Sequence, residues 1–287
     1  MRRTILLLLC RGLLILMVSG FAGAVLVRLA PGFDVDERAL DARFSAATLD
    51  RIGKERAADR NPLRFYAQYL GGLLRGDAGR SVVFGQPVAS LIRERLPATG
   101  KRVAEGMVLG WGGALLLGLA AALVRRTPVV AATMLINGAL LSIPSAVLAT
   151  MCLLLRLSPS IAIACVIFPR VCPHVYEQFR AALAAPHVMT ARARGLRPER
   201  LFCFHVLPSA LRPLVSLFAV SVTLAFGASI AVEALSDSAG IGEMAWRAAL
   251  GRDLPVLVAV TLLLTAITVA SNVAAEAATL GLGRTSA

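Results

Sequence analysis

The stretch from Thr190 to Pro208 reads TARARGLRPERLFCFHVLP and places charged side chains between segments that are almost free of charge. Four arginines and one glutamate are found there, in a chain of which only 16% is charged. Helix-favouring residues flank Gly195, and a glycine lets the backbone turn sharply between two helices. The pattern predicts a helix, a bend and a second helix, a shape that can dock into a groove on another protein. Spacing alone leaves the alternative of an ordinary solvated loop open.

Side chains for catalysis or metal binding do not form a recognisable set. None of the three histidines, His174, His187 and His205, lies next to a plausible nucleophile. Cys172 and His174 are only two candidate ligands on one helix, fewer than a metal site needs. LRGDAGRS at 74–81 lacks the first glycine and the lysine of a phosphate-binding loop. We therefore expect no catalytic residue, metal or cofactor, and expect any ATP to be bound by a partner.

The composition indicates an integral membrane protein. Hydrophobic residues make up 57% of the chain and the mean hydropathy is +0.74. The net charge of +13 could indicate nucleic-acid binding, but the arginines are spread over loops. They are not accompanied by an aromatic platform or a recognition helix. We therefore expect an all-α protein in contact with membrane lipid, and no nucleic acid.

Apolar runs of roughly 20 residues predict about six transmembrane helices. The fourth is the shortest and must continue through Arg170 to about Tyr176 to cross the bilayer. The first also resembles a cleavable signal peptide, although Arg11 interrupts its apolar run. The predicted spans are 12–27, 103–124, 129–155, 157–176, 213–232 and 254–275.

The distribution of arginine predicts that both termini are cytoplasmic. Among the short loops, the inner ones then receive most of the basic residues, and the outer ones receive only Arg156, Arg247 and Arg252. We predict three parts. These are an N-terminal transmembrane helix at 1–30, an extracytoplasmic segment at 31–101, and a five-helix core at 102–287 with a cytoplasmic loop at 177–212. Part of that loop's basicity has a simple cause, because arginines resist translocation.

Two charged residues of the predicted spans are candidates for a translocation pathway. A charge buried in the bilayer is costly, so it is a functional candidate by default. Arg170 has the alternative of extending its side chain toward the membrane surface from between Pro169 and Pro173. Glu233 lies where the predicted fifth span meets the outer side. Both stay candidates at this point.

Short motifs along nearly the whole chain resemble a single family. TARARGLRPERLFCFHVLPSALRPL resembles the cytoplasmic coupling loop of permeases from ATP-binding cassette importers, in their peptide and nickel branch. Further segments resemble other parts of that branch in the same order, and Glu233 lies where the family usually has glutamate. These segments are VRLAPG (27–32), YLGGLLRGDAGRS (69–81), PVASLIRERLPAT (87–99), LSIPS (141–145), VEALSDSAGIGEM (232–244) and GRDLPV (251–256).

The resemblance implies a type I importer permease fold in the inner membrane and an assembly of several chains. Two permeases, the second a nonidentical paralogue, would join two cytoplasmic ATP-binding subunits and an extracytoplasmic solute-binding protein. The solute would be a peptide, or a related small solute such as nickel. The basic stretch would contact the ATPase. Its residues in this sequence are Thr190, Ala191, Arg192, Ala193, Arg194, Gly195, Arg197, Glu199, Arg200, His205, Leu207 and Pro208.

Some positions depart from the family pattern. Met189 stands where a charged residue is frequent, and Ser238 and Ala239 stand where Trp-Pro is frequent. Two other classes of protein remain as alternatives. A self-contained secondary transporter would show internal repeats and matched broken helices, and the sequence shows no such repeat. A membrane-embedded enzyme would need a paired nucleophile and base.

Overall fold

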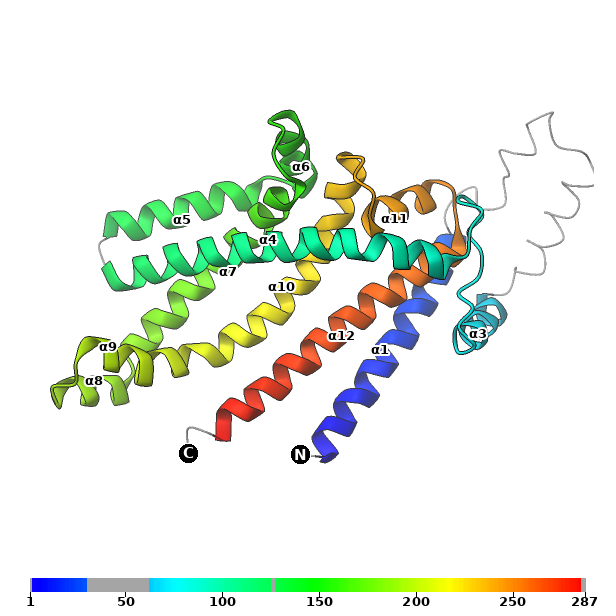
Figure 1. The fold of residues 1–287 in the computed structure, drawn as a ribbon. Helices are drawn as coiled ribbons and strands as arrows, with labels where there is room; N and C mark the ends of the chain where they lie inside the picture. The colour runs from blue at the N-terminus through cyan, green and yellow to red at the C-terminus, as the bar shows by residue number, and fades with distance from the viewer. Residues whose placement is uncertain (1, 30–61, 125–126, 285–287) are drawn as a thin grey trace, which may run out of the picture. The chain divides into compact units, whose positions relative to one another are not determined.

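A computed structural model of the chain describes residues 2–29, 62–124 and 127–284, and these form helices joined by short turns (Figure 1). The all-α fold class is confirmed. The α-helices are α1 (Arg2–Leu29), α3 (Pro62–Leu73), α4 (Val88–Val124), α5 (Thr127–Ser142), α6 (Ser145–Leu154), α7 (Pro159–Leu183), α8 (Pro186–Ala193), α9 (Pro198–Leu201), α10 (Leu207–Leu235), α11 (Ile241–Leu250) and α12 (Leu254–Arg284). A π-helix, η2 (Phe202–Val206), joins α9 to α10.

Five of the six predicted spans fall on a single helix each, and the third falls on the pair α5 and α6. Among the described residues, four helical segments are long and apolar enough to cross a membrane, and the bent pair α5 and α6 would make a fifth. A shorter apolar stretch, Cys10–Leu26, lies in α1. The four long segments are Val88–Val124, Pro159–Leu183, Pro198–Leu235 and Leu254–Thr279.

The third predicted span, 129–155, is not one straight helix. Its two halves, α5 and α6, meet at an angle of 94°. Pro144 explains the break, because proline donates no backbone hydrogen bond and disfavours helical geometry in the residue before it. The prediction of a single continuous helix was therefore wrong for this span. The second predicted span also differs, because α4 begins at Val88 and not at residue 103.

The chain folds into two compact units. Unit 1 comprises Met1–Leu96 with Met244–Ala266, and unit 2 comprises Pro97–Glu243 with Ile267–Ala287. The predicted division at residues 30 and 101 follows membrane topology and stays a prediction. Residues 31–61 of the predicted extracytoplasmic segment lie outside the described residues.

In unit 1, α1 is held against α3 and the beginning of α12. The Tyr66 hydroxyl donates a 2.9 Å hydrogen bond to the Met17 carbonyl. The hydroxyls of Ser19 and Thr265 lie 3.0 Å apart. At Gly20, an added Cβ would lie 2.6 Å from the Tyr66 hydroxyl. Glycine is therefore required for this close approach of α1 to α3.

Also in unit 1, the motifs GDAGRS and GRDLPV meet at one buried carboxylate. Asp253 accepts hydrogen bonds from the Ser81 hydroxyl and, at 2.9 Å, from the Val83 amide. The Ser81 hydroxyl in turn accepts from the Phe84 amide at 2.9 Å. Asp253 and Ser81 are both buried. These contacts give the two motifs a structural role, which is to fix the loop before α4 onto the loop before α12.

In unit 2, α4 packs closely on α7 through glycines. An added Cβ at Gly106 would lie 2.7 Å from Ile163 Cγ2, and one at Gly118 would lie 2.9 Å from Val175 Cγ1. Small residues at helix contacts let two backbones approach, which is a principal source of packing energy in membranes. The α4 glycines therefore bring α4 close to α7, the helix that carries Arg170.

We expect Gly106→Ala to destabilise unit 2 by about 1–3 kcal/mol, because the new methyl group overpacks the contact with Ile163. Thermal unfolding of the purified protein in detergent measures this loss. Gly112→Ala is the matched control, since a Cβ at Gly112 meets nothing within 4 Å. Equal unfolding temperatures for the two variants would contradict the role of Gly106 in packing.

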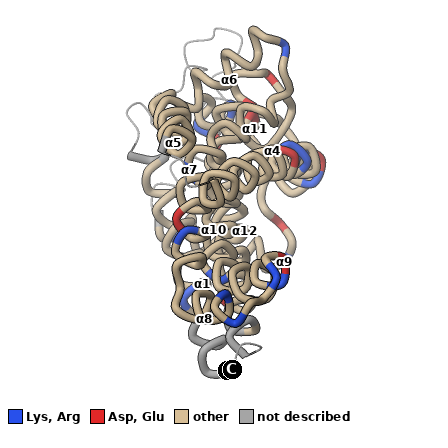
Figure 2. Tube along the Cα trace, turned by 90° about the vertical axis from the view of Figure 1, so that its left-hand side faces the viewer, with Lys and Arg blue, Asp and Glu red and all other residues tan. Residues whose placement is uncertain are grey.

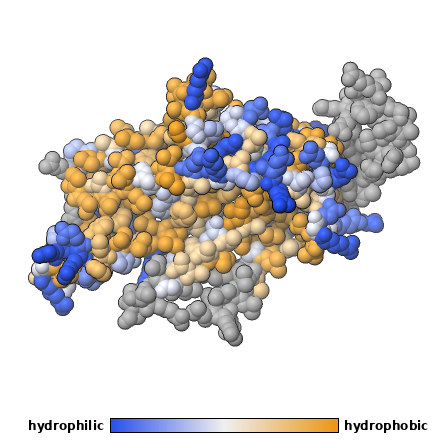
Figure 3. Space-filling view, viewed as in Figure 1, coloured by the Kyte–Doolittle hydropathy of each residue, from blue (hydrophilic) through white to orange (hydrophobic). Residues whose placement is uncertain are grey.

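Helices α5, α6 and α10 of unit 2 pack against α7. Helix α10 contacts α7 and α6, and α5 contacts α7. Trp111 of α4 and Phe218 of α10 lie with their ring centroids 5.5 Å apart. Large apolar side chains such as Leu116 and Leu135 point outward, and Figure 3 shows a largely hydrophobic surface over α4 and α5. Such a surface suits contact with lipid.

Candidate functional site

The basic stretch forms the predicted helix, bend and second helix. Helix α8 ends at Ala193, and Gly195 has a φ of +75°. The Gly195 amide donates to the Arg192 carbonyl at 3.0 Å, and the Leu196 amide to the Ala191 carbonyl at 3.4 Å. This pair of bonds is a Schellman motif, in which the residue after the helix adopts the left-handed conformation that glycine favours. Below, α8, the Gly195 turn and α9 are called the basic hairpin.

The second helix differs in part from the prediction. Only Pro198–Leu201 is α-helical, and Phe202–Val206 is a π-helix in which the Leu207 amide donates to the Phe202 carbonyl. Pro208 lies in the first turn of α10, as predicted. Because Pro208 has no amide proton and its ring crowds the carbonyl four residues earlier, a wider turn just before it avoids that conflict.

The inner side of the basic hairpin is part of the hydrophobic core of unit 2. Val188, Ala191 and Leu201 are buried in the same cluster as residues of α7. The rings of Phe179 and Phe202 stack with centroids 5.9 Å apart. The hairpin is therefore fixed on the end of α7, which argues against an ordinary solvated loop.

The outer side of the basic hairpin is cationic. Arg192, Arg194, Arg197 and Arg200 are exposed, and Figures 2 and 3 show the charged residues gathered over α8 and α9. Among the described residues, no carboxylate forms an ion pair with any of the four. Arg194, Arg197 and Arg200 line an open pocket of about 440 Å³ together with Gly195 and Leu196.

The other predicted residues of this stretch lie in varied environments. Thr190 donates to the Pro186 carbonyl of its own helix at 2.9 Å. Ala193, Glu199 and Pro208 are exposed, whereas Leu207 is partly buried against the core. His205 Nδ1 is buried and has no hydrogen-bond partner within the described part of the chain.

The sequence interpretation missed two exposed apolar residues of this region. Met189 is 62% exposed and Phe204 is 73% exposed. Beside the exposed arginines, these two side chains could add apolar area to a contact with another protein. Their helical phase relative to the buried residues Val188 and Val206 could have identified them.

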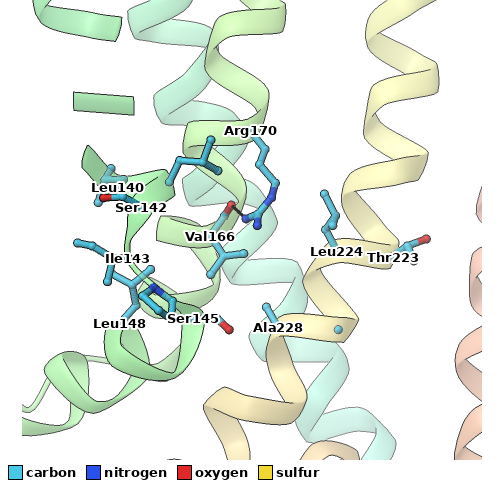
Figure 4. A pocket seen from close by; sticks show the side chains of 13 residues that line it. Leu140, Ser142, Ile143, Ser145, Leu148, Val166, Arg170, Thr223, Leu224 and Ala228 are labelled. Atoms are coloured by element: carbon cyan, nitrogen blue, oxygen red, sulfur yellow. Dashed lines mark hydrogen bonds between the residues drawn. The ribbon is translucent and has the colours of Figure 1, made fainter. Parts of the chain in front are cut away.

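Arg170 lies near the middle of the 25-residue helix α7. Its Nη1 donates a 2.7 Å hydrogen bond to the Val166 carbonyl, one turn earlier in the same helix. The side chain borders a pocket between the break at Pro144 and α10 (Figure 4). Arg170 is thus brought to a cavity, as a pathway residue would be, while its contact with a solute stays a prediction.

Glu233 is fully buried at the far end of α10 and has several hydrogen-bond partners. Its carboxylate accepts from Arg102 Nη1 at 3.0 Å, from the Thr99 hydroxyl at 3.0 Å and from the Gly242 amide at 2.8 Å. A Cβ added at Gly240 would overlap Glu233 Oε2. The carboxylate therefore fixes the turn after α10 onto α4. A role for Glu233 in contacting a solute stays a prediction.

Comparison with known proteins identifies the family. The sequence model of the family described as "Binding-protein-dependent transport system inner membrane component" matches residues 114–284. The chain belongs to this family. The matched region contains the basic hairpin, Arg170 and Glu233, and the resemblance predicted from the motifs is confirmed. The chain is a multi-pass inner-membrane protein and a permease.

Individual relatives match most of the permease. The oligopeptide transport system permease protein AppB of Bacillus subtilis is 23% identical over 88% of this chain and 89% of its own length. The glutathione transport system permease protein GsiC of Pectobacterium atrosepticum is 25% identical over 88% and 87%. The dipeptide transport system permease protein DppB of Lactococcus lactis is 24% identical over 69% and 71%. The likeness therefore extends beyond the region that the family model matches.

Proposed function

We propose that this permease forms half of the translocation pathway of an ATP-driven peptide importer, and that the basic hairpin is its contact with a separate ATPase. The observation that carries the proposal is the two-sided hairpin. Its inner side is packed into the core of unit 2, whereas four arginines and Met189 of the hairpin are exposed, and Phe204 of the adjoining π-helix is exposed as well. A rigid surface of this kind suits docking into a protein groove rather than solvation.

The exposed arginines of the basic hairpin favour a partner whose surface carries carboxylates. Each guanidinium can bind a carboxylate in bidentate fashion. Met189 and Phe204 add apolar area to the same region. We therefore expect an ATP-binding subunit with carboxylates around an apolar groove. A second, nonidentical permease and an extracytoplasmic solute-binding protein complete the proposed assembly.

The structure also offers a route for coupling. From Pro198 to Leu235 the chain forms one helical segment of 38 residues. A shift of the basic hairpin would therefore move α10 as a unit. ATP binding in the partner would favour one of two packings of the helices, and hydrolysis the other.

The proposed solute is a peptide. The relatives described above are named as oligopeptide, dipeptide and glutathione permeases. Nickel was left open by the resemblance of the motifs and is the second candidate. Since a separate binding protein would select the solute, residues of this chain would act after that selection.

Co-purification and transport test the proposal. We expect the tagged permease to co-purify from its native membrane with an ATP-binding subunit and a second permease. In proteoliposomes, this complex and its binding protein should import short peptides only when ATP is present. Uptake by the purified chain alone, driven by an ion gradient without ATPase subunits, would instead indicate a secondary transporter.

A further inference from the structure

Arg170 carries a charge in the middle of an apolar, membrane-length helix. A charge at such depth requires a partner or a hydrated cavity. Within the described residues, no carboxylate pairs with Arg170, and its hydrogen bond goes to the Val166 carbonyl of its own helix. A guanidinium has five N–H donors, and the bond to Val166 uses only one of them.

The guanidinium borders a pocket of about 430 Å³ in unit 2. Its walls come from α7, from α10 and from the break between α5 and α6 (Figure 4). Apolar side chains, including Ile143, Leu148 and Leu224, provide much of the lining. Polar groups, including Ser142, Ser145 and Thr223, line the rest, so a cavity of this size can take a small solute that carries both apolar and polar groups.

The break supplies a second set of hydrogen-bond donors to this pocket. Helix α6 begins at Ser145, and its N-cap residue, Pro144, provides no side-chain cap. The first amides of a helix lack partners within the helix and carry partial positive charge. The Ser145 side chain also projects into the space between α6 and α10 (Figure 4). In secondary transporters, a different class, the N-terminus of a broken helix can face an anionic group of the solute.

We propose that Arg170 and the first turn of α6 bind the C-terminal carboxylate of the transported peptide. The inference rests on the proposed function, which makes the solute a peptide. A carboxylate matches the planar fork of the guanidinium and the uncapped amides of α6. The apolar lining then faces the last side chain of the peptide. A lipid phosphate offers similar oxygens, but it belongs at the membrane surface, whereas Arg170 lies mid-helix.

The test compares peptides that differ only at the carboxyl end. The complete transporter, with its binding protein, is given a defined mixture of peptides of two to five residues, or the same peptides amidated at the C-terminus. Imported peptides are quantified by mass spectrometry, and the ratio of acid to amide uptake is recorded. We expect Arg170→Gln to lower this ratio about tenfold, because a charge-assisted hydrogen bond is lost. Arg170→Lys, which keeps the charge without the fork, should lower it less.

Controls separate this role from a structural one. Arg156→Gln changes an exposed arginine in the turn before α7 and should leave the ratio unchanged. Membrane abundance and ATPase co-purification report whether the Arg170 variants assemble. A fall in acid and amide uptake by the same factor, or no fall, would overturn the proposal. An effect seen in anionic liposomes but absent in zwitterionic ones would assign Arg170 to lipid. If the wild type imports neither mixture, the proposed function itself fails.

Discussion

Replacing Gly195 with valine is expected to leave the permease in the membrane at near-normal abundance and to reduce ATP-driven peptide uptake at least tenfold. Gly195 has a φ of +75°, in the left-handed region that a β-branched residue resists. A Cβ there would meet nothing within 4 Å, so the strain comes from the backbone alone. Strain of this kind is about 1–3 kcal/mol, enough to displace a short hairpin without preventing membrane insertion.

Gly195→Asn is the matched control, because asparagine enters the left-handed region more readily than other non-glycine residues. It should retain most uptake, and Gly195→Ala should fall between the two. Membrane abundance, co-purification of the ATP-binding subunit and peptide uptake are measured for all three variants. If the valine variant shows normal uptake, the basic hairpin is not the coupling contact, and its arginines need no role beyond holding that loop in the cytoplasm.

Replacing Arg102 with alanine is expected to destabilise the permease by about 3–5 kcal/mol, because it leaves a buried carboxylate without its counter-charge. The Glu233 side chain is 0% exposed, and Arg102 Nη1 lies 3.0 Å from its carboxylate. The same arginine donates to the Ala239 carbonyl. Its removal therefore also frees the turn that follows α10. Thermal unfolding of the purified protein, and the folded yield from membranes, measure this loss.

The neighbouring residue Lys101 provides a control for general effects of removing a charge. Its side chain is 78% exposed and lies 4.0 Å from Glu105. An exposed pair of this kind contributes little, so Lys101→Ala should change stability by less than about 1 kcal/mol. Similar unfolding temperatures for the Arg102 and Lys101 variants would show that the buried pair does not stabilise the turn.

Much of the fold could be predicted from local features of the sequence. These features are the apolar runs, the distribution of arginine and Gly195. Five of the six predicted spans fall on single helices, because a run of apolar residues near 20 in length has few other stable conformations in a bilayer. The bend at Gly195 was predictable because a sharp turn after a helix requires a left-handed residue. Both the apolar runs and the glycine are local signals, so they could be interpreted without knowing which helices pack together.

The features that were missed depend on distant residues or on a single residue within an apolar run. Arg102 and Glu233 are 131 positions apart, and nothing near either one identifies the other. The close contact of Gly106 with Ile163 also joins separate helices. The 94° bend arises from Pro144, within a stretch whose hydropathy alone predicts one helix. The pocket beside Arg170 depends on that bend, so it could not be predicted either.

The continuous helix from Pro198 to Leu235 could transmit movement from one end of unit 2 to the other. At 1.5 Å per residue its 38 residues would extend over roughly 55 Å, with the basic hairpin at one end and the buried Glu233 near the other. Its irregular part, the π-helix with Pro208 and Pro213, lies next to the basic hairpin. We infer that the regular remainder could move as one rigid segment about this irregular part. A displacement of the basic hairpin would then reach the turn after Glu233 through this single helix.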